Sequence, residues 1–213
     1  MQFETIVLGQ SADGVWQDLD HAVERAVAHL ASGGLLAHPT TGVYGVGGVR
    51  ESDVEECLTR LKDRAPERGF VYLVPDYARA RAEFPRAEWA GLPEQFAGIF
   101  WPGALTLILH DGDRTGVALR AEAHPVTQAV LQRWSGAISS TSLNRTGEAA
   151  AVTSMEARTV LRDLPLADRP VLLLDVGSLP GPPPSTLVQV RGDTFTILRQ
   201  GAIESAAIES ARG

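Results

Sequence analysis

A run of small polar side chains occupies residues 138–147, which read ISSTSLNRTG. Ile138 is typical of the end of a buried strand, and hydroxyl residues and the amide of Asn144 follow it. Hydroxyl groups, an amide and backbone N–H groups beside Gly147 could together hold the oxygens of a phosphate. A loop rich in serine and threonine is also a common turn, so both interpretations stay open at this point.

Three cations stand close together in LKDRAPERGF, ahead of an apolar stretch. Lys62, Arg64 and Arg68 could bind an anion, because guanidinium and ammonium groups form strong charge-assisted hydrogen bonds. Cations are also favoured at the C-terminal end of an ordinary solvated helix. Asp63 and Glu67 dilute the positive charge, so the segment alone does not decide between the two.

Further polar residues follow other apolar stretches. AHPTTGVYGVGG at residues 37–48 combines Thr40 and Thr41 with glycines, which let a backbone approach a ligand closely but also suit a tight turn. Arg120, Ser185 and Arg199 each lie at the end of an expected strand. A single arginine at the end of a strand is usually a surface charge. These residues therefore indicate a binding site only in combination.

Several widespread catalytic signatures are absent from the sequence. It has no Walker A pattern, no GxGxxG, no HExxH and no GxSxG. The five histidines, His21, His29, His38, His110 and His124, show no metal-ligand spacing, and His38 and His124 are expected to be structural. Any phosphate site must therefore be of a less common kind.

The composition limits the class of protein. The chain has 213 residues, 44% hydrophobic content, a net charge of -7 and one cysteine, Cys57. One substantial core is expected, while wrapping of nucleic acid is disfavoured by the charge and a disulfide framework is excluded. No signal peptide and no apolar run long enough to span a bilayer is apparent, which favours a cytoplasmic protein without a membrane partner.

Hydrophobic periodicity predicts alternating helices and strands. A capping box at Ser52 and Glu55 is expected to open the second helix, and the residues after Arg199 are expected to pack loosely. The expected helices are 19–30, 52–61, 94–100, 126–134 and 154–161, and the expected strands are 34–39, 71–75, 105–109, 116–120, 137–139, 171–176, 185–190 and 195–199. The pattern predicts an α/β fold with strands that both follow helices and pair as neighbours.

Taken in order, these segments resemble one family, the YrdC/TsaC-type threonylcarbamoyl-AMP synthases. The resemblance rests on AHPTTGVYGVGG, LKDRAPERGF, FWPGALTLIL, VALRAEAHP, SSTSLNRTG, STLVQV and ILRQGAI. It extends from about residue 15 to about residue 203. Its most specific parts are the KxR element, Lys62 to Arg64, and the SxN element, Ser142 to Asn144. The resemblance implies a single YrdC-like domain over residues 1–213, with a twisted mixed sheet, flanking helices, a ligand cavity at the strand ends and a tail at 204–213.

The resemblance also implies an activity, namely synthesis of threonylcarbamoyl-AMP and pyrophosphate from L-threonine, bicarbonate and ATP for modification of tRNA. Mg²⁺ would accompany ATP, and tRNA or a downstream threonylcarbamoyl transferase would be a candidate partner. The implied central residues are Lys62, Arg64, Ser142 and Asn144, with Ser142 and Asn144 as candidates to help seat the metal. ATP would contact Arg64, Arg68, Ser142 and Arg199, and threonine would contact Thr40, Arg120, Ser140 and Ser185, with the turn from Pro39 to Tyr44 lining the same pocket.

The chain departs from the family pattern at four positions. Thr41 stands where an acidic residue is common, Gly42 where threonine or alanine is common, Ala65 for a frequent proline and Leu143 for a frequent alanine. YciO-type relatives generally lack the intact Lys62–x–Arg64 and Asn144 elements, which favours the synthase. A YciO-like enzyme and an RNA-binding module that uses a concave basic face remain the alternative hypotheses.

Overall fold

The apolar stripe near the N-terminus forms helix α1 (Leu19–Ala31), as its spacing predicts. Ala22, Ala26 and Leu30 on this helix are completely buried. The following strand, β2 (Leu35–Pro39), is buried along its whole length, which explains why its sequence is continuously apolar and does not alternate.

The computed structural model describes residues 3–61, 69–112, 114–164 and 169–212. Within these ranges ten strands form one continuous sheet in the order β1-β8-β2-β3-β7-β4-β6-β5-β9-β10. The other strands are β1 (Glu4–Val7), β3 (Tyr44–Val49), β4 (Val71–Val74), β5 (Leu105–Asp111), β6 (Arg114–Ala121), β7 (Ile138–Ser142), β8 (Val171–Asp175), β9 (Thr186–Arg191) and β10 (Thr194–Arg199).

The sheet is mixed, as expected. β1, β8 and β2 run parallel to one another, as do the pairs β4 with β6 and β5 with β9. β3 and β7 in the centre pair antiparallel with both of their neighbours. This arrangement brings β2, β3, β7, β4 and β6 side by side although they come from distant parts of the chain.

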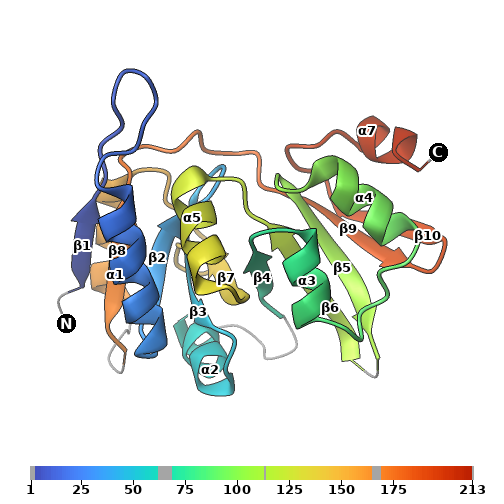
Figure 1. Ribbon diagram of the computed structural model, residues 1–213, viewed down its shortest axis with the longest axis horizontal. Coiled ribbons are helices and arrows are strands. Elements are labelled where there is room, and N and C mark those ends of the chain that lie inside the picture. The colour runs from blue at the N-terminus through green and yellow to red at the C-terminus, as the bar shows by residue number, and fades with distance from the viewer. Residues whose placement is uncertain (1–2, 62–68, 113, 165–168, 213) are drawn as a thin grey trace.

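Helices flank the sheet (Figure 1). α1 and α5 lie beside each other over the half that contains β1, β8 and β2, and α3 and α4 lie over the half that contains β5 and β6. The remaining helices are α2 (Ser52–Leu61), α3 (Tyr77–Glu83), α4 (Leu92–Phe100), α5 (Pro125–Trp134), α6 (Ser154–Asp163) and α7 (Ser205–Ser210). No helix in the described ranges is long and apolar enough to cross a bilayer.

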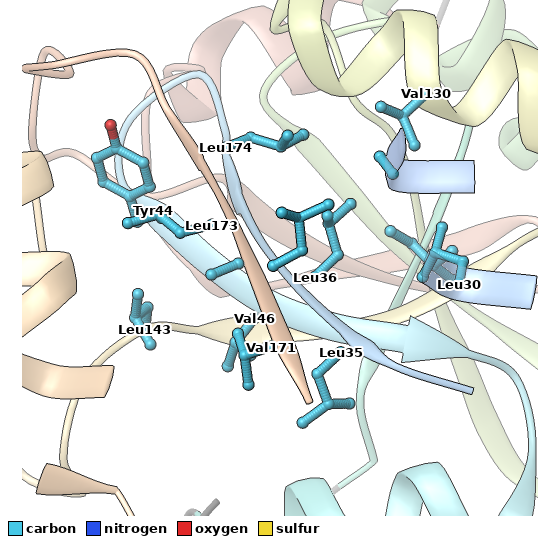
Figure 2. Close-up of a cluster of buried hydrophobic side chains, with 14 of the residues drawn as sticks. Leu30, Leu35, Leu36, Tyr44, Val46, Val130, Leu143, Val171, Leu173 and Leu174 are labelled. Carbon is cyan, nitrogen blue, oxygen red and sulfur yellow. The ribbon is translucent and has the colours of Figure 1, made fainter. Parts of the chain in front are cut away.

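Two hydrophobic clusters support the two halves of the sheet. The first is built around β8, β2 and β3, and Figure 2 shows Leu36, Val46 and Leu173 within it. Tyr44 lies at its edge, where its hydroxyl donates to the carbonyl of Gly177 at 3.0 Å. The second cluster is built around β6, β5 and β9 with α3 and α4. The sheet thus extends across two hydrophobic cores, and the packing of each core fixes the strands of its half of the sheet.

Three expectations from the sequence are wrong. Residues 44–49, interpreted as part of a turn, form the buried strand β3. Ile138 begins strand β7 and does not end one, so the hydroxyl run lies in a strand. The loosely packed tail contains helix α7, on which Ile208 is fully buried in the second cluster. Expected helices and strands elsewhere are confirmed, and β1 and α3 were not anticipated.

Candidate functional site

One large cavity collects the described residues that sequence reasoning singled out. Its volume is about 1160 Å³, and its lining includes Thr40, Arg120, Ser140, Ser142, Asn144, Ser185 and Arg199. The turn between β2 and β3 lines it as well, as expected. Lys62, Arg64 and Arg68 lie outside the described residues.

Strand β7 presents its hydroxyl groups to this cavity because of the pleat. Alternate residues share a face of a strand, and Ser140 and Ser142 both line the cavity. They pair with Gly47 and Gly45 of β3. A Cβ atom on Gly47 would lie 1.9 Å from the carbonyl oxygen of Ser139, so glycine at this position allows β3 to approach β7.

The residue before Ser140 has a different partner. Ser139 is fully buried, and its hydroxyl donates to Glu55 Oε1 at 3.1 Å, which also accepts from the hydroxyl of Tyr72 at 2.8 Å. Glu55, expected to complete a capping box, therefore joins helix α2 to the sheet beneath the cavity. The side chain of Ser52, the other member of that expected box, lies outside the described part of the chain. A reciprocal capping box is found at Thr153 and Glu156, at the start of α6.

The SxN element is ordered by its own side chains. Ser142 Oγ donates to Asn144 Oδ1 at 2.7 Å, and Asn144 Nδ2 donates to the carbonyl oxygen of Glu148 at 2.7 Å. Leu143 between them is fully buried, and its N–H donates to the carbonyl of Tyr44 at 2.9 Å. The departure at Leu143 thus fills the core and leaves the two polar side chains at the cavity wall.

His38 lies behind Ser140, a position that sequence reasoning treated only as structural. His38 Nε2 is 3.1 Å from Ser140 Oγ, and Nδ1 is 3.3 Å from the carbonyl oxygen of Pro39. Burial lowers the pKa of His38 to about 4, so the imidazole is neutral at pH 7. A neutral ring that donates from Nδ1 can accept the Ser140 hydroxyl at Nε2, which orients that hydroxyl at the cavity wall.

Arg120, at the end of β6, is paired with a carboxylate that the sequence did not single out. Arg120 Nη2 donates to Glu122 Oε2. Glu122 is fully buried, and its Oε1 accepts from the N–H of Thr41 at 3.0 Å. An acidic residue two positions after a strand-end arginine was the available signal, but the sequence gives no reason for the Thr41 contact.

Arg199 lies in different surroundings on β10. Its Nη2 donates to the carbonyl oxygen of Ser185 at 2.9 Å, and the Ser185 hydroxyl is 2.8 Å from Thr106 Oγ1. Burial, together with the charge of Arg120, lowers the pKa of Arg199. The two guanidinium groups are therefore close enough to repel each other, a condition that an anionic ligand would relieve.

The loop before Ser185 packs against the departure at Gly42. The N–H of Gly181 donates to the Gly42 carbonyl at 2.8 Å, and a Cβ atom on Gly42 would lie 3.0 Å from the Gly181 carbonyl oxygen. The prolines that follow, 182–184, line the cavity. Glycine at position 42 thus allows this loop to form one wall.

The described cavity residues offer few oxygen atoms to a metal ion, so a metal here would be bound mainly through the phosphates of a bound ligand. In the described ranges no cluster of three or more histidine, cysteine, aspartate or glutamate side chains could hold a metal ion. The Ser142 hydroxyl and the Asn144 amide oxygen are hard oxygen donors at the cavity wall. Such donors suit Mg²⁺, which keeps waters and binds through phosphates with few protein ligands.

Comparisons with known proteins found similar sequences. The Sua5/YciO/YrdC family model, described as "Telomere recombination", matches residues 28–201. The threonylcarbamoyl-AMP synthase of Photobacterium profundum is 30% identical over 191 residues, which cover 84% of this chain and 98% of the relative. That of Stenotrophomonas maltophilia is 34% identical over 140 residues, 61% of this chain and 75% of the relative.

Solved structures share the fold. P. abyssi Sua5 complexed with L-threonine superposes with a TM-score of 0.81 at 20% identity and covers 98% of this chain. This chain spans 61% of that longer protein. E. coli YciO gives a TM-score of 0.78 at 20% identity, with 97% of this chain and 98% of YciO covered.

Proposed function

The chain belongs to the Sua5/YciO/YrdC family, and on that premise we propose that it makes threonylcarbamoyl-AMP from L-threonine, bicarbonate and ATP. This reaction makes it a nucleotidyltransferase. Its relatives from Photobacterium profundum and Chromohalobacter salexigens carry the name threonylcarbamoyl-AMP synthase, and both align over 84% of this chain and 98% of their own length. The product would serve tRNA modification in the cytoplasm, through a downstream transferase that acts on tRNA.

One observation carries the proposal. A single cavity of about 1160 Å³ contains two arginines of different environment, Arg120 and Arg199, together with the Ser142–Asn144 element. Ligand pockets commonly measure about 300–1000 Å³, so this cavity has room for an amino acid beside a nucleotide. Two separate anion-binding groups suit a reaction that joins two anionic ligands.

The chemistry requires positioning more than covalent participation. The amine of threonine condenses with bicarbonate, with loss of water, to give a carbamate. A carbamate oxygen then attacks the α-phosphorus of ATP. The new P–O bond forms as the bond to pyrophosphate breaks. Holding the two reactants together in line supplies much of the acceleration, and fixed donors offset the crowded negative charge.

The described residues divide these tasks. Arg120 would bind the carboxylate of threonine, while Thr40, Ser140 and Ser185 would orient its other polar groups. Ser140 is itself oriented by His38. Arg199 and Ser142 would contact ATP, and Lys62, Arg64 and Arg68 are proposed to add positive charge on the nucleotide side.

Mg²⁺ is proposed to accompany ATP. When bound, it would neutralise phosphate charge, with Ser142 Oγ and Asn144 Oδ1 as the described protein oxygens that suit it. The 2.7 Å bond between these groups keeps both at the cavity wall. Without the metal, the hydrogen bond between Ser142 and Asn144 holds this part of the cavity wall in place.

The proposal is tested by pyrophosphate release from purified protein. With ATP, Mg²⁺, L-threonine and bicarbonate, pyrophosphate should accumulate, and omission of either threonine or bicarbonate should stop it. A panel of other amino acids replaces threonine as the control. Release that depends on another acceptor would favour a YciO-like relative, and salt-dependent binding of RNA without any release would favour an RNA-binding module.

A further inference from the structure

The two arginines of the cavity differ in how their charge is compensated. The side chain of Arg120 is only 12% exposed and is paired with the fully buried carboxylate of Glu122. Arg199 donates only to the carbonyl and hydroxyl oxygens of Ser185, and no described carboxylate lies within ion-pairing distance of it. One guanidinium is therefore neutralised within the protein, and the other has no such partner in the described ranges.

The carboxylate of Glu122 is fixed by more than the ion pair. Its Oε1 accepts from the N–H groups of Thr41 at 3.0 Å, Ala123 at 3.0 Å and His124 at 3.1 Å. Its Oε2 accepts from Arg120. One side chain thus joins the end of β6, the start of α5 and the turn after β2, which places Arg120 and the Thr40–Thr41 turn in a fixed relation.

Arg120 keeps hydrogen-bonding capacity despite this pair. Its Nε is buried and has no hydrogen-bond partner among the described residues, and the side chain lines the cavity. A buried donor without a partner is costly, so a ligand acceptor at this position is favoured. The acceptor must tolerate the nearby charge of Glu122, however, since like charges in a poorly solvated site repel strongly.

We propose that Glu122 is a positioning and specificity-determining residue that reserves Arg120 for the amino-acid carboxylate and excludes phosphate from it. A carboxylate carries one negative charge and can use the fixed donors of Arg120. A pyrophosphoryl group carries more charge and is repelled by Glu122, so it is directed to Arg199. The inference rests on the proposed function, because it assigns the two ends of the same cavity to the two substrates of that reaction.

Glu122→Gln separates the two roles of the carboxylate. The amide oxygen can still accept from the N–H groups of Thr41, Ala123 and His124, whereas the amide nitrogen would face the Arg120 donor and the negative charge is lost. The variant should therefore keep the backbone contacts and lose the ion pair. Glu24→Gln, an exposed change on α1 with the same loss of charge, is the matched control.

The test is titration of L-threonine into the purified protein by calorimetry, with and without inorganic pyrophosphate. In the wild type, pyrophosphate should leave threonine affinity unchanged, and Glu24→Gln should behave in the same way. In Glu122→Gln, threonine affinity should fall between about tenfold and a hundredfold, and pyrophosphate should now compete with threonine. A purely structural role of Glu122 would weaken threonine binding without creating that competition.

Glu122→Asp covers the case in which the glutamine variant does not fold, because it keeps the charge on a shorter side chain. It should weaken threonine binding while pyrophosphate stays excluded. Competition by pyrophosphate in the wild type or in Glu122→Asp would overturn the inference, as would unchanged threonine binding in a folded Glu122→Gln. Failure of the wild type to bind threonine at all would contradict the proposed function itself, so the two failures are distinguishable.

Discussion

At the level of single residues, Arg120 and Arg199 have different surroundings, and we propose that they bind different ligands. Arg120 should be needed both for threonine and for stability. Arg120→Ala should abolish threonine binding with less effect on ATP, and should lower the free energy of unfolding by about 3–5 kcal/mol, because Glu122 is left buried without its ionic partner. Calorimetry and denaturant unfolding measure the two effects.

Two variants control this prediction. Arg120→Lys should restore only part of the threonine affinity, since the planar fork of donors is lost. Arg199→Ala should weaken ATP binding instead, with little change in stability, because this arginine has no described carboxylate partner. Equal loss of both ligands in a folded Arg120→Ala protein would argue against separate subsites.

Asn144 should affect the reaction more than the fold. Asn144→Ala removes the acceptor of the Ser142 hydroxyl and the donor to the Glu148 carbonyl. We expect the rate of pyrophosphate release to fall by about tenfold or more, because a misplaced contact at the reacting groups costs this much. The melting temperature should stay close to that of the wild type. An unchanged rate would remove the SxN element from the site.

At the scale of elements, the pairing of β3 with β7 holds the cavity wall in place. Gly47→Ala should lower the free energy of unfolding by about 3 kcal/mol or more, because a Cβ atom would lie 1.9 Å from the carbonyl oxygen of Ser139. Gly98→Ala is the control. Gly98 is exposed within α4 with no neighbour within 4 Å of an added Cβ, so that change should stabilise by about 0.5–1 kcal/mol.

Helix α7 should contribute to stability although its sequence is weakly patterned. Ile208 is fully buried in the second cluster, so Ile208→Ala should cost about 2–5 kcal/mol in denaturant unfolding. Glu209→Ala on the exposed side of the same helix should have little effect. Equal stability of the two variants would mean that the end of the chain packs loosely after all.

Local pattern predicted many of these elements but not all. The helical spacing in α1 and the apolar run of β8 are strong signals, and both elements form as expected. Strand β3 was missed because three of its six residues are glycines, which resemble a turn until β7 is known to lie beside them. Helix α7 was missed because it has one fully buried side chain, Ile208, and depends on tertiary packing.

The site was predictable to a similar degree. The resemblance named residues whose described members line one cavity, while their individual roles stay predictions. It could not reveal His38 behind Ser140 or Glu122 beneath Thr41, because both contacts join residues more than eighty positions apart. Such contacts follow from the strand order, which no local pattern contains.

At the scale of the whole molecule, buried imidazoles make stability depend on pH. Burial lowers the pKa of His38 to about 4, and burial also lowers the pKa of His124. Between about pH 6.5 and 4 the unfolded chain therefore binds more protons than the folded chain, so stability falls as the pH falls through this window. His38 alone accounts for about 3 kcal/mol of that loss.

Denaturant unfolding at a series of pH values checks this expectation. His38→Gln should be less stable at neutral pH but should lose less stability between pH 6.5 and 4 than the wild type. Its stability should otherwise follow the same curve, because His124 and the carboxylates are unchanged. Parallel curves for the two proteins would show that His38 is not buried in its neutral form.

We propose that the cavity joins two ligands, and the ratio of the two products provides a direct test of this proposal. Purified protein is given ATP, Mg²⁺, L-threonine and labelled bicarbonate, and pyrophosphate is measured against label recovered in the adenylate. We expect one labelled carbon in threonylcarbamoyl-AMP for each pyrophosphate released, and neither product without threonine. Pyrophosphate released without label in an adenylate, or without threonine, would contradict it.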